Sequence, residues 1–273
     1  MTQNKITPED LQEIFTALQK AKLDAVVVGG QAVNLWAYKY CDRAPKLKEL
    51  LPFASEDLDF YGGRLEVITC QDALQGKAKI NRDFDPSPNS GLVMVNRNNL
   101  DLRINFLASV YGLNDAEITG TALPFLGQEK LAGINIKVLH PVLCLEGKLR
   151  CLRSLPQSGR QDKKHVEMSI LCIKELLKDV CTQQEPRSGL KLVERVLGSA
   201  LREDGLSAWY RYSICVEDAI PVEIIQKLTN EKWHKFYERR LPQLIEQLSE
   251  KRKQYLEVME RIVARTKNLE PES

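Results

Sequence analysis

The sequence lacks any long apolar run. No segment reaches the roughly eighteen consecutive apolar residues of a membrane-spanning helix, and Met1–Lys5 is not followed by the apolar stretch of a secretory signal. Neither sign of charge dominates, since 39 basic and 37 acidic residues leave a formal charge of +2. This balance excludes a uniformly basic nucleic-acid-binding surface, so any such contact must come from a local patch. We expect a soluble, cytoplasmic protein that makes no membrane contact.

Common cysteine and histidine motifs are also absent. The seven cysteines contain no Cys-x-x-Cys pair, and the three histidines are not spaced as zinc ligands with them. The usual zinc-site patterns are therefore excluded. We interpret the cysteines as reduced, mostly core residues. A cysteine nucleophile with a histidine base stays open, although nothing in the local sequence favours it.

The chain has enough length and apolar content for more than one folded unit. Its 273 residues, 43% of them hydrophobic, fit two modest domains or one domain with a large helical extension. Strand-like and helix-like segments alternate in the first part, whereas the later part is helical and charged. Periodicity there predicts helices over Leu190–Arg202, Pro221–Leu228 and Pro242–Arg265. We predict an α+β domain at residues 1–155 and a helical domain at residues 156–273.

A short buried strand leads through two glycines into a helix. Ala25–Val28 is apolar and mostly β-branched, Gly29 and Gly30 follow, and Gln31–Tyr40 has helical periodicity. A helix that begins at glycines offers free backbone N–H groups to a phosphate, because no Cβ is in the way. A tight turn without a ligand explains the same residues equally well. The segment is neither a P-loop nor a Rossmann fingerprint.

Two carboxylates follow within a second extended stretch, Ser55–Phe60. Because strand side chains alternate, we expect Asp57 and Asp59 to project from the same face. Adjacent carboxylates repel each other unless a cation lies between them, and such oxygen ligands suit Mg²⁺ bound jointly with substrate phosphates. A solvated turn is the simpler explanation of the pair alone, but the Gly29–Gly30 turn upstream favours a metal site. Ser55 either caps the turn or touches a phosphate.

A predicted hairpin adds a polar face. Leu92–Val95 and Leu100–Leu107 are separated by a polar turn, and in the second strand apolar residues alternate with Asp101, Arg103 and Asn105. The polar face could line the same cleft as the two aspartates.

These motifs resemble a known family. Val27–Val33 together with Ser55–Phe60 is similar to the nucleotidyltransferase fold of the polymerase-beta-like superfamily, and within it to AbiEii/MenA-like proteins, which include nucleotidyltransferase toxins of type IV toxin–antitoxin systems. The resemblance covers about residues 8–177. It implies a mixed β-sheet flanked by helices, followed here by a C-terminal helical region.

The resemblance also implies an activity. Asp57 and Asp59 would bind Mg²⁺, the NTP triphosphate would lie at Gly29 and Gly30, and an acceptor hydroxyl would attack the α-phosphorus with loss of pyrophosphate. The implied acceptor is RNA such as a tRNA end, with a small molecule as a subsidiary option. An antitoxin protein is the implied partner.

One position departs from the family. Many relatives carry a third carboxylate on a strand reading apolar-Asp-Phe-Leu, where this chain has Ile104-Asn105-Phe106-Leu107. Asn105 cannot act as an anionic ligand or as a base. Asp101 lies on the same strand face as Asn105, about 13 Å from it along the strand. It can therefore replace the missing ligand only if the register places it opposite the Asp57 strand. We take Asp101 as the candidate third ligand, and a catalytically weakened protein that binds nucleotide or a partner without turnover as the alternative.

Later charged residues complete the candidate site. Lys148 falls on the apolar side of a predicted helix over Pro141–Arg153, so it either snorkels to the surface or enters a cleft. The resemblance implies that Lys148 meets the triphosphate. Arg160, Lys164 and His165 match a charged cluster of the relatives only loosely, and a polar helix start explains them as well.

A second basic segment lies near the C-terminus. It could form an RNA-facing patch with stacking rings, or an amphipathic helix with a solvated basic side. Its basic residues are Lys232, Lys235, Arg239 and Arg240, interleaved with Trp233, Phe236 and Tyr237.

Overall fold

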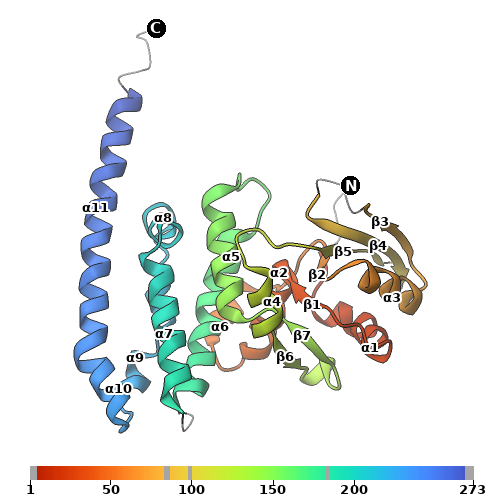
Figure 1. The fold of residues 1–273 in the computed structure, drawn as a ribbon, viewed down its shortest axis with the longest axis horizontal. Coiled ribbons are helices and arrows are strands. Elements are labelled where there is room, and N and C mark those ends of the chain that lie inside the picture. Colours follow the sequence, from red (N-terminus) through yellow and green to blue (C-terminus); the bar gives the residue numbers. More distant parts are fainter. Residues whose placement is uncertain (1–4, 83–86, 98–99, 183–184, 268–273) are drawn as a thin grey trace. The chain divides into compact units, whose positions relative to one another are not determined.

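The chain forms two compact units. The computed structural model describes residues 5–82, 87–97, 100–182 and 185–267 (Figure 1). The first unit comprises Met1–Cys151 and Pro156–Cys172, and the second comprises Leu152–Leu155 and Ile173–Ser273. The division falls inside helix α6 (Asp162–Thr182), whereas the sequence placed a boundary before it. The predicted α+β class is confirmed, with a mixed sheet, flanking helices and a C-terminal helical region.

A seven-stranded sheet organises the first unit, in the order β3-β4-β5-β2-β1-β7-β6. The pairs β2–β5 and β1–β7 are parallel, and the remaining neighbours are antiparallel. The predicted hairpin is present as β4 and β5. The strands are β1 (Val26–Val28), β2 (Leu58–Tyr61), β3 (Lys77–Ile80), β4 (Asn89–Arg97), β5 (Leu100–Leu107), β6 (Leu123–Leu126) and β7 (Asn135–Val138).

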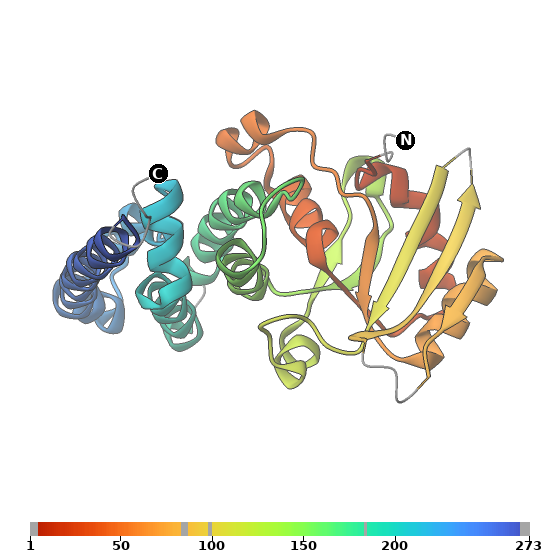
Figure 2. The same cartoon turned by 90° about the horizontal axis from the view of Figure 1, so that it is seen from above.

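Helices cover one face of the sheet at its β3 end and leave the other face open. Figure 2 looks onto the open face of β4 and β5, with α1 and α3 lying behind the strands. The stretch at 65–76, ambiguous in sequence, is mostly helix α3. The helical segments of this unit are η1 (Glu9–Leu11), α1 (Gln12–Lys20), α2 (Gly29–Tyr40), η2 (Pro45–Leu50), α3 (Arg64–Leu74), α4 (Asp115–Thr121), η3 (Glu129–Leu131) and α5 (Pro141–Ser154).

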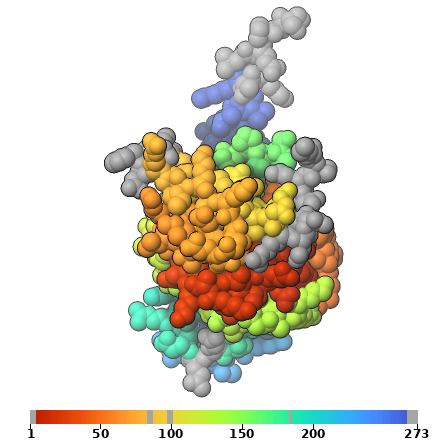
Figure 3. All heavy atoms as spheres, turned by 90° about the vertical axis from the view of Figure 1, so that its right-hand side faces the viewer, coloured from red at the N-terminus to blue at the C-terminus, as the bar shows by residue number. Residues whose placement is uncertain are grey.

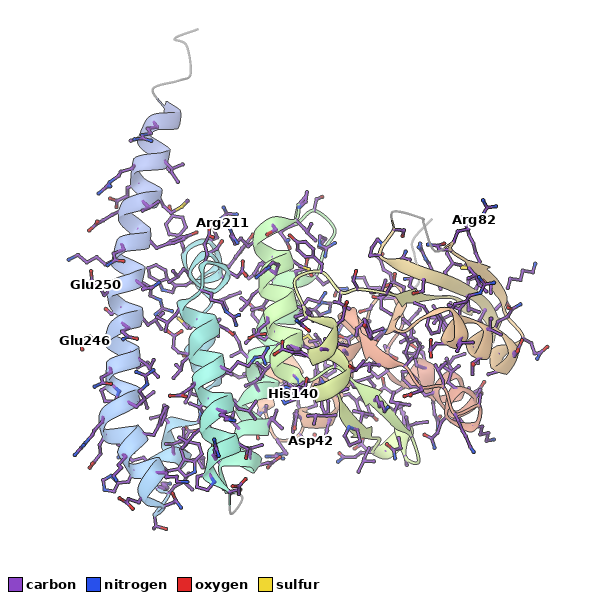
Figure 4. The ribbon with its side chains drawn as sticks, viewed as in Figure 1. Asp42, Arg82, His140, Arg211, Glu246 and Glu250 are labelled. Atoms are coloured by element: carbon purple, nitrogen blue, oxygen red, sulfur yellow. The ribbon has the colours of Figure 1, made fainter. Side chains whose placement is uncertain are left out.

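Local sequence accounts for several helix starts. Thr7 and Asp10 cap the first helical turn reciprocally, because the Thr7 backbone N–H donates to Asp10 Oδ2 (2.8 Å) and the Asp10 N–H donates to Thr7 Oγ1 (3.4 Å). At α5, the backbone N–H of Val142 donates to Nδ1 of His140, which is labelled in Figure 4. These contacts satisfy N–H groups that have no partner inside the helix.

The sheet core aligns the strands that carry the candidate site. Phe60 of β2 stacks on Phe106 of β5 with ring centroids 5.4 Å apart, and both are buried. Leu58 and Ile104, which pair two residues earlier on the same two strands, are fully buried. Burying these four side chains fixes the register, because a one-residue slip would turn the apolar set to the opposite face.

The second unit is helical. Its Arg153 binds Glu203 (2.8 Å) and Asp204 (2.9 Å), which open helix α8. The predicted helix over Pro221–Leu228 is wrong in extent, since only Val222–Ile225 is α-helical. The other segments are α7 (Pro186–Leu201), α8 (Glu203–Tyr212), η4 (Val216–Ala219), α9 (Val222–Ile225), α10 (Glu231–Lys235), the π-helical η5 (Phe236–Arg240) and α11 (Leu241–Lys267).

The second unit does not form the basic patch with stacking rings. Trp233 is 1% exposed and Phe236 is 5% exposed, so two of its three rings belong to the core. Nearby acids also pair with basic groups of the segment, as in Lys235–Glu231. Amphipathic packing explains the segment, and periodicity alone could not say which side of the helix is buried.

The cysteines and the polarity of the helices were two subjects of expectation from composition. All seven cysteines are free, and four are buried, namely Cys70, Cys144, Cys172 and Cys181. Within the described residues, none of the helices has the combination of length and low polarity needed to cross a membrane.

Two glycines of α7 give a matched test of packing in the second unit. A Cβ on Gly189 would lie 2.8 Å from the buried Trp233 ring, whereas a Cβ on Gly198 would meet nothing within 4 Å. We expect Gly198→Ala to stabilise the protein by about 0.5–1 kcal/mol, because alanine favours the helix. Gly189→Ala should destabilise it by about 1 kcal/mol, because overpacking exceeds that gain. Urea unfolding of both variants measures these changes. Equal stabilisation by the two substitutions would contradict the prediction, because it would show that the Trp233 ring moves aside at no cost in free energy.

Candidate functional site

The Gly29–Gly30 turn is packed directly against the aspartate strand. Gly29 begins α2 with φ +67°, a left-handed conformation that favours glycine. A Cβ on Gly29 would collide with the Asp59 carboxylate, and one on Gly30 would collide with Oγ of Ser55. Both glycines are therefore needed for close approach, and the backbone at the start of α2 lies against the carboxylate.

The two aspartates converge on one amide. Asp57 lies in the bend before β2 and Asp59 lies within β2. The Asn105 side chain donates from Nδ2 to Asp57 Oδ2 (3.0 Å) and to Asp59 Oδ1 (2.8 Å). Its Oδ1 accepts a hydrogen bond from Arg103 Nε (2.8 Å). The amide thus places the positive end of its dipole between two carboxylates.

The register explains this convergence. Asp59 pairs with Val28 of β1 on one side and with Asn105 of β5 on the other. Position 105 therefore lies beside Asp59, and an asparagine occupies it.

Asp101 is not beside the pair. It lies opposite Asn96 in the β4–β5 hairpin, is exposed, and accepts a hydrogen bond from Asn96 Nδ2 (2.6 Å). The pairing of β2 with β5 begins at Ile104. The condition under which Asp101 would replace a third ligand, a register opposite the Asp57 strand, is not met.

The environment of Asp59 disfavours its charge. Burial, followed by the negative charge of Asp57, raises the pKa of Asp59 to about 6 from an ordinary 3.8. Asn105, Lys148 and Arg103 act in the opposite direction without cancelling the effect. A cation beside the pair would lower this pKa, because it favours the charged form of the carboxyl.

Lys148 turns inward from α5. Its side chain is only 16% exposed and its Nζ lies 3.0 Å from Oδ1 of Asp162, which is buried. Arg160 binds the other oxygen of Asp162. Although burial raises the pKa of Asp162, Lys148 and Arg160 hold it below its ordinary value. Its ammonium, bonded to a buried carboxylate, does not snorkel to the surface, and its charge lowers the pKa of Asp59.

His165 is buried and neutral. It is 4% exposed, and burial, followed by the charge of Lys148, lowers its pKa to about 3. Neither ring nitrogen has a hydrogen-bond partner among the described residues. A Cβ on Gly30 would lie 3.1 Å from Cε1 of His165, so the imidazole ring packs against the glycine turn. Among the predicted charged residues, His165 therefore contributes no charge and acts as part of the wall behind the glycine turn.

The start of α6 fixes the loop before β2. Lys164 Nζ donates to the backbone oxygen of Pro52 (2.7 Å), and Gln161 Nε2 donates to that of Ala54 (3.1 Å). Burial and the charge of Lys5 lower the pKa of Lys164. Lys164 thus supports the loop that leads into Asp57.

A buried polar network lies beneath the turn. Ser55 Oγ accepts from Asn34 Nδ2 (3.1 Å), which also donates to Gln31 Oε1 (3.2 Å), and Gln31 donates to the backbone oxygen of Ile6 (2.8 Å). The site thus gives Ser55 a structural bond. Sequence reasoning gave no role to Gln31 and Asn34, and it did not predict that Arg103 would bond to Asn105 or Asp162 to Lys148. Polar residues in the otherwise apolar start of α2 were the available signal for the first two.

Metal-ligand groups are few. The described residues contain no cluster of three or more His, Cys, Asp or Glu side chains placed to hold a metal ion. Asp57 and Asp59 form a pair completed by a neutral amide. No family model, curated protein or solved structure matches the chain.

The raised pKa of Asp59 predicts a pH-dependent stability. A carboxyl whose folded pKa exceeds its unfolded value binds protons more tightly in the folded state, so stability falls as the pH rises from about 4 to about 6 and is constant above. Asp59→Asn should therefore stabilise the protein by about 3 kcal/mol at pH 8 and by only about 1 kcal/mol at pH 4.5. Urea unfolding in EDTA measures both values.

Asp101→Asn is the control, because it removes an exposed carboxylate from the next strand. At pH 8 it should stabilise the protein much less than Asp59→Asn does, because Asp101 is exposed. A difference between Asp59→Asn and wild type that does not vary with pH would contradict the raised pKa.

Proposed function

We propose that the first unit is a Mg²⁺-dependent nucleotidyltransferase, which moves an NMP from an NTP to the hydroxyl of an acceptor, RNA such as a tRNA end. The contact between the Gly29–Gly30 turn and the Asp59 carboxylate carries this proposal. The contact places the start of a helix, which suits a phosphate, beside a carboxylate pair, which suits a cation. Transfer from an NTP requires both at one point.

The donor set fits a hard cation. Asp57 and Asp59 present oxygens to the same small volume, opposite the N–H groups of Asn105, and burial and the negative charge of Asp57 raise the pKa of Asp59. These two residues would hold Mg²⁺. When bound, the ion supplies charge stabilisation at the phosphate oxygens and a more acidic acceptor hydroxyl.

Other residues have roles in positioning. The free N–H groups at the start of α2 would bind phosphate oxygens, and Lys148 would add a positive charge on the same side of the site. In the transfer, the acceptor oxygen forms a bond to the α-phosphorus, the bond from that phosphorus to the β-phosphate bridging oxygen breaks, and pyrophosphate leaves. Asp162 and Arg160 hold Lys148, so they support the site without touching the reacting atoms.

A second candidate function rests on Asn105. Its amide already satisfies both carboxylates, so the pair is stabilised without an ion. This favours the alternative in which the protein binds nucleotide or a partner, such as an antitoxin, without turnover.

Loss of either aspartate should abolish transfer. Asp57→Ala and Asp59→Ala should each lower the rate by about 10² or more, since the ion's transition-state contribution of several kcal/mol is lost. Labelled NTPs with Mg²⁺ and total RNA provide the assay. Asp101→Asn should leave the rate unchanged, and a loss of similar size there would restore Asp101 as a ligand. Transfer at the wild-type rate in either alanine variant would contradict the metal-site assignment.

Asn105→Asp separates the two candidate functions. In a competent enzyme at saturating Mg²⁺ it should give no gain in rate, because Asp57 and Asp59 already hold the ion under that condition. In a degenerate site the restored carboxylate should create metal-dependent transfer. A wild type inactive with all four NTPs and an active Asn105→Asp variant would overturn the enzyme proposal.

A further inference from the structure

The open face of β3, β4 and β5 carries three cations, which we call the basic strip: Lys77, Lys79 and Arg103. All three are exposed. On the opposite face, Val93, Val95 and Leu102 are buried beneath α3 and its neighbours. Figures 2 and 3 show β3 and β4 at the surface of the first unit.

The register connects the strip to the carboxylate pair. Asp59 pairs with Asn105, Asn105 with Leu92, and Leu92 with Lys79, so the four lie in one row across four strands. At a strand spacing of about 4.8 Å, Lys79 is about 14 Å from Asp59.

A second row runs beside the first. Arg103 pairs with Met94, and Met94 with Lys77. Met94 is 44% exposed, so an apolar side chain lies open between two cations. The two rows form a continuous track that ends at Asn105 and Asp59.

The charge of the track is largely uncompensated. Neither Lys77 nor Lys79 forms an ion pair within the described part of the chain. Asp101 is the only acid among the described residues of the three strands, and it is hydrogen-bonded to Asn96 at the edge. Since the whole chain has a formal charge of only +2, this concentration is local.

We propose that the basic strip binds the phosphate backbone of a single-stranded RNA whose terminal hydroxyl lies at Asp57 and Asp59. This rests on the proposed function and identifies the docking surface of its acceptor. A nucleic-acid strand carries one charge per nucleotide and ends in a hydroxyl, which matches cations that lead across strands to the carboxylate pair. Leu92 and Met94 offer the bases an apolar surface between the cations. For the binding of an acidic protein, by contrast, the cations would not have to lead to the carboxylate pair.

Removing two of the charges tests the proposal. Lys77→Gln/Lys79→Gln should weaken the binding of a fluorescein-labelled single-stranded RNA at least about tenfold at low salt, and reduce the slope of log affinity against log salt by about 1.4. Fluorescence anisotropy in EDTA, without NTP, measures binding alone. The control, Lys46→Gln/Lys130→Gln, removes two exposed lysines elsewhere on the first unit and should leave both values unchanged.

The outcomes separate this inference from the proposed function. Lysine-dependent RNA binding without transfer would support the strip and overturn the enzyme. Transfer to RNA with equal affinity in Lys77→Gln/Lys79→Gln and wild type would overturn the strip alone, as would equal losses in both double variants. Poly-L-glutamate that binds as tightly as RNA, with the same dependence on Lys77 and Lys79, would overturn RNA in favour of an acidic protein.

Discussion

The amide of Asn105 holds two like charges together at the centre of the first unit. Through Nδ2 it donates one hydrogen bond to Asp57 and one to Asp59, while its oxygen is held by Arg103. Without this donor, two converging carboxylates in a partly buried site would repel each other strongly, because the local dielectric screens them less than water does. The raised pKa of Asp59 indicates that part of this cost persists.

The sheet topology brings Asn105 and the glycine turn to the two sides of Asp59. The parallel pairing of β2 with β5 places Asn105 beside Asp59, and the antiparallel pairing of β1 with β2 places Val28, and so the glycine turn, on the other side. A larger residue at Gly29 would strike the Asp59 carboxylate. Strand order therefore joins the helix start, the carboxylates and the amide into one site, and all three depend on the buried Phe60–Phe106 stack that sets the register.

Sequence predicted the features that depend on local periodicity. The strand before Gly29, the helix after it, the β4–β5 hairpin and helix α5 all follow from short-range patterns. Pairing between distant strands leaves no such signal, so the position of Asn105 beside Asp59, and the separation of Asp101 from it, could not be predicted. Nor could the pair of Lys148 on α5 and Asp162 on α6, two residues that lie 14 positions apart along the chain. For the segment around Trp233 and Phe236, the periodicity indicated an amphipathic helix as one of two alternatives, but it could not identify the side that the fold buries.

Asparagine at position 105 sets a balance between stability and cation binding. A carboxylate there would place a third negative charge against Asp57 and Asp59 with Arg103 as its neighbouring cation, so the site would depend on an ion to be stable. The neutral amide removes that dependence, but an ion that binds both aspartates must first displace the two N–H donors. At the proposed site, cation affinity would therefore be reduced by the free energy of those hydrogen bonds, which are individually worth about 1.5–3 kcal/mol when the acceptor is charged. The residue that stabilises the carboxylate pair without an ion would thus also limit how tightly the proposed site holds one.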